Sequence, residues 1–438
     1  MKRMKRILLG LACVALLAAS WAAAVTSKSN ADRQRELIDQ ASAYTQDEIY
    51  ILAVPLLEEA ASYQDDFTPE AESALKQVYL RLAEKDNFQR RYMNLLEKQM
   101  ARKDAGPEVF QEAALYDFEI GKTSDALAVL RNGIAKTGSE DLTRLYEERR
   151  YAFRCGRNVY DEASEIYRGT SQVAQGGLWG LASGTGIPYV PCEYDKISTF
   201  DEDRAIVQKD GVISAVDRDN NRVALLHTEA GDFGNYAENR LGLKSEAGWL
   251  LATGTFQTGS TVFEELGMFT GGYAPAKLNG KWGPAGADGG EWLIEPQYDD
   301  VVRDDLGRCG DPAALFVRRN GSVYLLKDGE EIAGPFEDAR PFQGGWAAVR
   351  EGGKWGFVDT DGAVRIPCRF DGARSFGQHL AAVKEGDLWG YVSLQGELVI
   401  EPQFLEAKSF SGGSAPVRTG LGWQFISLLE YEGGGGLF

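Results

Sequence analysis

The residues best suited to chemistry gather in one acidic stretch in the second half of the chain. It contains four carboxylates, Asp299, Asp300, Asp304 and Asp305. Glycoside hydrolases use two carboxylates, one as general acid and the other as base or nucleophile. A solvated acidic loop is the competing interpretation in a chain with 65 acidic residues. We therefore treat the four acids as candidates for ligand binding, and a glycosidase or other hydrolase as the alternative.

Two tryptophans are further candidates for ligand binding. Trp292 and Trp346 lie outside the regular positions of the other tryptophans in this half of the chain. An exposed aromatic ring would stack on a sugar or a peptide. Packing against neighbouring strands is the competing interpretation for both rings.

The residues needed for other chemistries are missing or wrongly spaced. Asp217–Asn221 and Asp359–Gly362 begin like calcium loops, but neither has the glutamate that such a loop needs at its twelfth position. The five cysteines show no CxxC spacing, and His227 and His379 stand apart from any nucleophile motif. We therefore predict no catalytic residue, no metal and no cofactor.

An apolar position that recurs at a nearly constant spacing organises this half of the chain. The markers of this position are Trp179, Ile213, Trp249, Trp282, Val323, Trp355, Trp389 and Trp423. The steps between them are 34, 36, 33, 41, 32, 34 and 34 residues, and such a period is typical of a repeat protein. The isoleucine and the valine indicate that the position is occupied for packing. The longest step contains the acidic stretch, which is the most individual loop of the array.

Glycine follows the tryptophan at Trp179, Trp282, Trp355 and Trp389, and a proline-aromatic-acid element follows further on, as in Pro367 to Asp371. From about Val173 to the C-terminus the chain therefore resembles the WG-repeat (WG β-repeat) family. The resemblance implies a bacterial repeat protein, often exported, with a binding or structural role and no catalytic residues.

Each unit reads as a short antiparallel meander. Residues 380–384, 388–393 and 398–400 alternate like strands, and the turns between them contain glycine. The glycine after tryptophan would let a neighbouring backbone or ring approach closely. Seven or eight meanders favour a propeller-like array, with an open β-solenoid as the alternative. The last unit lacks its third strand, and no N-terminal strand is evident to complete it, which argues against a closed ring.

The preceding residues follow a helical period. Thr68-Pro69 and Pro107 mark helix starts, and the segment from Pro107 to Gly138 predicts two antiparallel helices. This segment resembles a tetratricopeptide repeat, with Ala114 and Ala126 at the close-packing positions. We predict an α+β multidomain chain with a membrane segment over 1–30, a TPR-like helical domain over 31–168 and a WG-repeat β domain over 169–438. The helical domain is a spacer or a peptide-binding groove.

The N-terminus predicts targeting to a membrane. Lys2, Arg3, Lys5 and Arg6 precede an uncharged apolar run from Ile7 to Val25. This run is longer than the apolar region of a typical signal peptide and close to the length of a spanning helix. The positive charges place the N-terminus in the cytoplasm. We expect a single-pass anchor with the bulk extracytoplasmic, and secretion after signal cleavage is the alternative.

The net charge of the chain limits the kinds of partner that it can bind. A formal net charge of -18 argues against nucleic acid, because a phosphate backbone requires a basic surface. We therefore expect a non-enzymatic binding or scaffold protein whose repeat surface meets a protein or glycan of the cell envelope.

Overall fold

The computed structural model describes residues 30–84, 87–226, 231–287, 289–311 and 313–431. The chain divides into two compact units, Met1–Glu147 and Glu148–Phe438. Residue 168, the predicted boundary between the helical and β domains, lies inside the second unit, and residues 150–167 are not helical. The predicted membrane segment over residues 1–30 falls almost wholly outside the described residues. No helix in the described ranges is both long and apolar enough to cross a membrane.

The first unit is helical, as the apolar period predicts. Residues 30–46 are helical and are followed by α2 (Tyr50–Ser62), α3 (Thr68–Arg81), α4 (Phe88–Met100), α5 (Pro107–Glu119), α6 (Thr123–Thr137) and α7 (Glu140–Arg149). Proline lies in the first turn of α3 and α5, where its missing N–H costs nothing. Gly138 ends α6 in the left-handed conformation, with φ of 66°. The predicted helix pair over 107–138 is confirmed, while its TPR-like nature stays a prediction.

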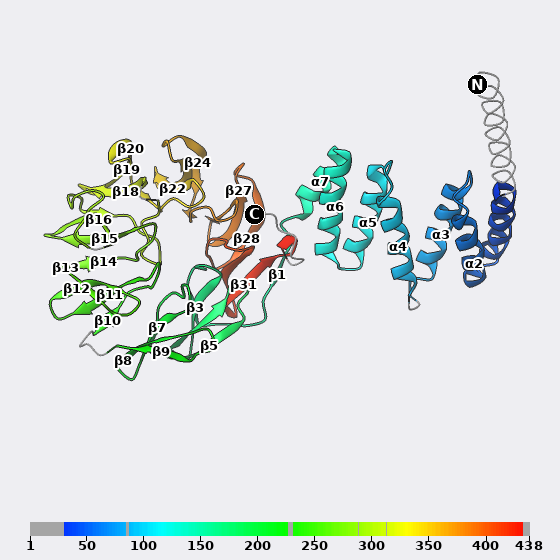
Figure 1. Cartoon of the computed structure of the whole chain (residues 1–438). Helices are drawn as coiled ribbons and strands as arrows, with labels where there is room; N and C mark the ends of the chain where they lie inside the picture. Colours follow the sequence, from blue (N-terminus) through cyan, green and yellow to red (C-terminus); the bar gives the residue numbers. More distant parts are fainter. Residues whose placement is uncertain (1–29, 85–86, 227–230, 288, 312, 432–438) are drawn as a thin grey trace, which may run out of the picture. The chain divides into compact units, whose positions relative to one another are not determined.

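The described residues of the second unit form eight antiparallel sheets that follow one another around a β-propeller (Figure 1). The first four blades consist of β2 (Glu162–Ala163), β3 (Thr170–Gln175), β4 (Leu178–Ser183) and β5 (Pro188–Tyr194); β6 (Lys196–Ile197), β7 (Ala205–Lys209), β8 (Val212–Val216) and β9 (Arg222–Leu225); β10 (Asp232–Phe233), β11 (Arg240–Ser245), β12 (Gly248–Thr253) and β13 (Thr258–Phe263); and β14 (Glu265–Leu266), β15 (Tyr273–Leu278) and β16 (Lys281–Gly286).

The other four blades complete the ring. They consist of β17 (Asp300–Val301), β18 (Ala314–Arg319), β19 (Ser322–Lys327) and β20 (Glu330–Phe336); β21 (Asp338–Ala339), β22 (Trp346–Glu351), β23 (Lys354–Asp359) and β24 (Val364–Phe370); β25 (Gly372–Ala373), β26 (Leu380–Glu385), β27 (Leu388–Ser393) and β28 (Leu398–Phe404); and β29 (Glu406–Ala407), β30 (Ser414–Thr419), β31 (Gly422–Leu428) and β1 (Phe153–Cys155). The propeller prediction is confirmed, and the β-solenoid alternative is wrong.

The eighth blade takes its outer strand from the start of the unit. β1 pairs antiparallel with β31, joining Phe153 to Leu428 and Cys155 to Ile426, and the two strands lie side by side in Figure 1. The sequence-based expectation that no N-terminal strand completes the last unit is therefore wrong. Pairing the two ends of the array removes the open edge that an unclosed ring would leave.

The tryptophan position is the same in every blade. Each marker is the second residue of the third strand of its blade, and it faces a residue of the second strand in register. Ile213, Trp282, Val323, Trp355 and Trp423 are buried. Trp179, Trp249 and Trp389 are half-buried. The packing role inferred from Ile213 and Val323 is thus correct, although three of the indoles keep an accessible edge.

The glycine after tryptophan is required by the outer strand. A Cβ on Gly390 would lie 2.4 Å from the Ile400 carbonyl oxygen, and one on Gly356 would lie 2.6 Å from the Ile366 oxygen. The outer strand shifts its register there, between the partners of Trp389 and Tyr391 in the seventh blade. Such a bulge brings backbone against backbone, so that only glycine fits.

A matched pair of glycine variants tests this packing. We expect Gly390→Ala to destabilise the propeller by about 1–3 kcal/mol, the usual cost of overpacking a tight interior. Gly420→Ala is the control, because a Cβ at Gly420 meets no atom within 4 Å and its φ is not in the left-handed region. Guanidinium unfolding followed by circular dichroism measures the difference. Equal stability of the two variants would show that the outer strand yields to the extra carbon.

Candidate functional site

The acidic stretch continues into a loop that lies at the centre of the ring. We call residues 302–311 the central loop. The Asn235 side chain donates a hydrogen bond to the Leu306 carbonyl (2.9 Å), and the Met268 amide donates one to the Gly307 carbonyl (2.9 Å). Leu306 is buried with Tyr167, Ala237 and Met268. Contacts to the first, third and fourth blades show that the loop reaches across the middle of the propeller.

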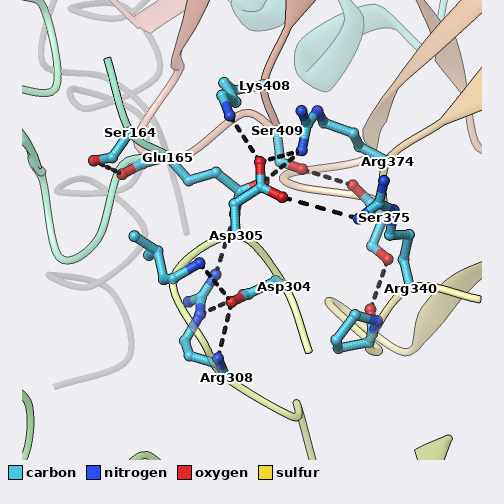
Figure 2. A network of polar contacts seen from close by, with 12 residues as sticks. Ser164, Glu165, Asp304, Asp305, Arg308, Arg340, Arg374, Ser375, Lys408 and Ser409 are labelled. Carbon is cyan, nitrogen blue, oxygen red and sulfur yellow. Dashed lines mark hydrogen bonds and ion pairs between the residues drawn. The ribbon is translucent and has the colours of Figure 1, made fainter. Parts of the chain in front are cut away.

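Asp305 anchors the central loop on the opposite side. Its Oδ2 lies 2.7 Å from both Arg374 Nη1 and Lys408 Nζ, and its Oδ1 lies 3.9 Å from Arg340 Nη1 (Figure 2). These three bases belong to the sixth, seventh and eighth blades. Burial alone would raise the pKa of Asp305, but the positive charges of Arg374 and Lys408 outweigh that effect and hold its pKa well below the usual range. Asp305 is therefore ionised at neutral pH, whereas a general acid must be protonated.

Asp304 turns the loop back on itself. Its side chain accepts hydrogen bonds from the amides of Leu306 (3.0 Å) and Arg308 (2.9 Å), and it pairs with Arg308 Nε at 2.6 Å. Arg308 also approaches the carboxylate of Glu165 at 3.4 Å. Glu165 is only 5% exposed, and burial together with the negative charge of Asp304 raises its pKa, against the opposing charges of Arg374 and Arg308.

Asp299 and Asp300 do not join this cluster. Asp299 is exposed, pairs with Lys281 at 2.7 Å and accepts a hydrogen bond from the Asn320 amide, and the bond from Lys281 lowers its pKa. Asp300 pairs with Arg303 at 3.1 Å, and burial raises its pKa. The structure therefore brings together only Asp304 and Asp305 of the four predicted acids.

The two predicted tryptophans contribute to blade packing. Trp292 lies beside the outer edge of the fourth blade, and its ring meets Phe263 edge-on at 5.9 Å. Trp346 begins β22, and its ring lies 5.3 Å from Phe376. Both side chains are half-buried, so packing accounts for most of their surface.

Sequence reasoning missed the partners of the two acids. Arg340, Arg374 and Lys408 follow one another at steps of 34 residues, which is the spacing of the repeat itself. That regularity was the available signal, because residues one repeat apart occupy the same place in successive blades. Glu165 had no comparable signal, since no other unit has an acid at the matching place.

Two open cavities adjoin the central loop. The first has a volume of about 520 Å³, and its lining includes Tyr167, Glu238, Thr270, Arg308 and Gln343. The second has a volume of about 420 Å³, and its lining includes Glu162, Ser164, Trp179, Asp305 and Lys408. In the first blade, Glu162 and Ser164 line the second cavity, whereas Tyr167 lines the first. The central loop contributes residues to both cavities.

A family model matches the repeat pattern. The sequence model described as "WG containing repeat" matches residues 189–212, 261–282, 327–355, 355–389 and 389–420. The chain carries WG repeats. These matches begin and end at several of the tryptophan markers, so each WG repeat spans the step from one blade to the next. Among curated proteins, no sequence matches this chain.

Solved structures resemble the WG-repeat propeller only distantly. PorZ of the type-IX secretion system of Porphyromonas gingivalis has 12% identity and a TM-score of 0.34, over 60% of this chain and 42% of that one. The extracellular domain of the putative hybrid two-component system BT4673 from B. thetaiotaomicron has 13% identity and a TM-score of 0.34, over 58% and 45%. YCF48 bound to D1 peptide has 12% identity and a TM-score of 0.33, over 62% and 99%. This chain thus covers less than half of the first two proteins.

Replacing Asp305 tests the role of the central loop. Asp305→Asn leaves Arg374 and Lys408 without their shared carboxylate, and loss of one partner of a buried ion pair is strongly destabilising. The Asp305 side chain is 35% exposed, so we discount this effect to about 1–3 kcal/mol at pH 7. Asp299→Asn, at an exposed ion pair, is the control and should cost clearly less than Asp305→Asn.

The pH dependence of the same variant gives a second readout. The folded state lowers the pKa of Asp305, so its contribution is complete above the unfolded pKa of about 3.9 and is lost as the pH falls below it. The stability difference between wild type and Asp305→Asn should therefore be constant from pH 5 to 7 and shrink towards pH 3. Urea unfolding at each pH measures it, and a difference that grows as the pH falls would contradict the assignment.

Proposed function

We propose that the chain is a non-enzymatic, extracytoplasmic binding or scaffold protein whose WG-repeat propeller presents a surface to a protein or glycan of the cell envelope. One observation carries the proposal. The acids of the central loop form ion pairs with bases of the propeller itself, and two open cavities lie beside the loop. Concave surfaces with a few polar groups and an aromatic ring are typical of binding sites.

The hydrolase alternative receives no support from the two acids that the structure brings together. Asp304 and Asp305 are both paired with bases, and the gap beside them, lined by Glu165, Arg340 and Arg374 among others, has a volume of only about 10 Å³. That is about the space of one water molecule and admits no sugar ring. The alternative stays an untested prediction.

The N-terminal sequence supports the proposed location. Four basic residues precede the apolar run from Ile7 to Val25, and such a segment directs the rest of a chain across a membrane. We propose a single-pass anchor, or secretion after cleavage, as the two forms of this location. Protease treatment of intact cells distinguishes an exposed propeller from one inside the cell.

The helical unit offers a second concave surface within its own fold. A cavity of about 990 Å³ lies among α2, α3 and α4, and Glu58, Glu72, Arg91, Lys98 and Arg102 contribute to its lining. Glu58 pairs with Arg91 at 3.1 Å, and Glu72 accepts a hydrogen bond from Gln99 at 2.8 Å. This polar groove suits a peptide, and a spacer role remains its alternative.

Filling either propeller cavity tests the proposed function. The purified full chain is screened against arrays of envelope glycans and of basic, acidic and neutral peptides. Gln343→Trp fills the first cavity, Ser164→Arg fills the second, and Gln403→Trp is an exposed control on β28. We expect one of the two cavity variants to weaken binding at least tenfold and the control to bind like the wild type. If nothing on the arrays binds, or if both cavity variants bind normally, the proposal fails.

A further inference from the structure

Nearly every tryptophan marker in the described part of the propeller has a cation over its ring. Five pairs show this arrangement, with the charged group 3.8–5.9 Å from the centre of the ring: Lys244 on Trp249, Arg303 on Trp282, Arg340 on Trp355, Arg374 on Trp389 and Lys408 on Trp423. A cation in this position is attracted by the negative face of the aromatic ring. A cation over the ring therefore accompanies five of the six tryptophan markers.

In the last three blades the cation comes from one structural position. The amides of Arg340, Arg374 and Lys408 each donate a hydrogen bond to a carbonyl of the second strand, at 2.8, 2.9 and 2.9 Å. In the first blade the amide of Ser164 makes the same bond, to the Gln172 carbonyl at 2.9 Å. Ser164 is therefore the residue that stands where the last three blades have arginine or lysine.

The short side chain of Ser164 leaves the indole of Trp179 uncovered. None of the described residues places a cation over this ring, although the side chain is only half-buried. The other source of a cation is also missing, because Ala174 faces Trp179 on the second strand, where Lys244 faces Trp249. Ser164 and Trp179 both line the 420 Å³ cavity, which thus includes the space that a cation fills elsewhere.

A carboxylate without a partner lines the same cavity. Glu162 begins β2 and is exposed, and no described residue forms an ion pair or a hydrogen bond with its side chain. The acids that begin other inner strands are paired, as Glu265 is with Lys277 (2.9 Å) and Glu406 is with Arg418 (2.9 Å). The first blade is thus the one that combines an uncovered tryptophan with an unpaired acid.

The two lysines in the lining do not neutralise this site. Lys196 is paired with Asp232 at 2.6 Å, and Lys408 is paired with Asp305 at 2.7 Å. Both ammonium groups are committed to carboxylates on other elements. The charge in the cavity lining that no ion pair neutralises is therefore negative, and the chain as a whole has a formal net charge of -18. Such a field attracts basic partners over a distance.

We propose that the second cavity binds a lysine or arginine side chain of a partner protein, with its charged group over Trp179 and beside Glu162. The incoming side chain would supply over Trp179 the cation that the other five tryptophan markers receive from the propeller itself. This inference rests on the proposed binding function and names the chemistry of its ligand. An amino sugar carries a cation as well, but it lacks the long apolar stem that would cross the cavity to reach the indole face.

Fluorine NMR of the full chain labelled with 5-fluorotryptophan tests the proposal. The chain contains 9 tryptophans, and the resonance of Trp179 is assigned from its loss in Trp179→Leu, which keeps an apolar residue at the marker. The probe is the peptide acetyl-Gly-Lys-Gly-amide. We expect it to shift the Trp179 resonance saturably and to leave that of Trp389 unchanged, because Arg374 already covers Trp389. The same peptide with norleucine, which lacks the charge, should cause no shift.

Two variants complete the test. Ser164→Arg places the chain's own cation at the vacant position, and Glu162→Gln removes the free charge. Each should raise the Kd of the lysine peptide about three- to thirtyfold, the range of a cation–π or ion-pair contact. Arg418→Gln, at the paired acid of the eighth blade, is the matched control and should leave the Kd unchanged.

Several outcomes would overturn the proposal. They are an equal shift with the norleucine peptide, an equal shift at Trp389, an unchanged Kd in Ser164→Arg, or tighter binding of glucosamine than of the lysine peptide. The proposed binding function would survive any of them if Gln343→Trp abolished binding to an array ligand. Conversely, if the lysine peptide bound as expected and no envelope ligand bound, the proposed binding function would fail and the inference about the second cavity would stand.

Discussion

The carboxylate of Asp305 is the contact on which the centre of the propeller depends. It belongs to the loop of the fifth blade, yet it is held by bases of the sixth, seventh and eighth blades, two of them at 2.7 Å. Those bases converge because the repeat places them identically in successive blades. The same bases lie over tryptophans, so the marker position and the central loop stabilise each other. The central loop, which is the longest departure from the repeat, thus fills the middle of the ring and connects blades on opposite sides of it.

A second constraint, the close approach of the outer strand, explains the WG pattern and its exceptions. In the fifth blade Tyr324 replaces the glycine, and a glycine appears instead on the outer strand, where a Cβ on Gly334 would lie 2.8 Å from the Val323 oxygen. In the third blade Leu250 pairs directly with Val262, and the close approach occurs at Gly248, where a Cβ would lie 2.6 Å from the Phe263 oxygen. The backbone geometry is therefore what the repeat preserves, and a glycine is placed on whichever strand needs it.

Much of this fold could be predicted from the sequence, because packing at a fixed period leaves a visible pattern. The eight markers gave the eight blades, and Pro107 and Gly138 bounded a helix pair. The closing strand β1 left no such pattern, since it has three residues and its partner β31 is more than 260 residues away. The acidic loop was recognised for its length and composition. The position of this loop at the centre of the ring could not be predicted. Bases one repeat apart indicate equivalent places in successive blades, but they do not show which carboxylate they face.

The contrast between Asp305 and Ser164 shows how departures from a repeat should be interpreted. Asp305 adds a negative charge, and three bases of the surrounding blades lie close to its carboxylate. The added charge is therefore compensated within the fold. Ser164 has no charge where the last three blades have a base, and none of the described residues places a cation over Trp179 or pairs with Glu162. A fold gains nothing from an aromatic face and a carboxylate left open together, because both are more stable with a cation nearby. An external partner is therefore best sought at the blades whose charged and aromatic groups find no partner within the propeller.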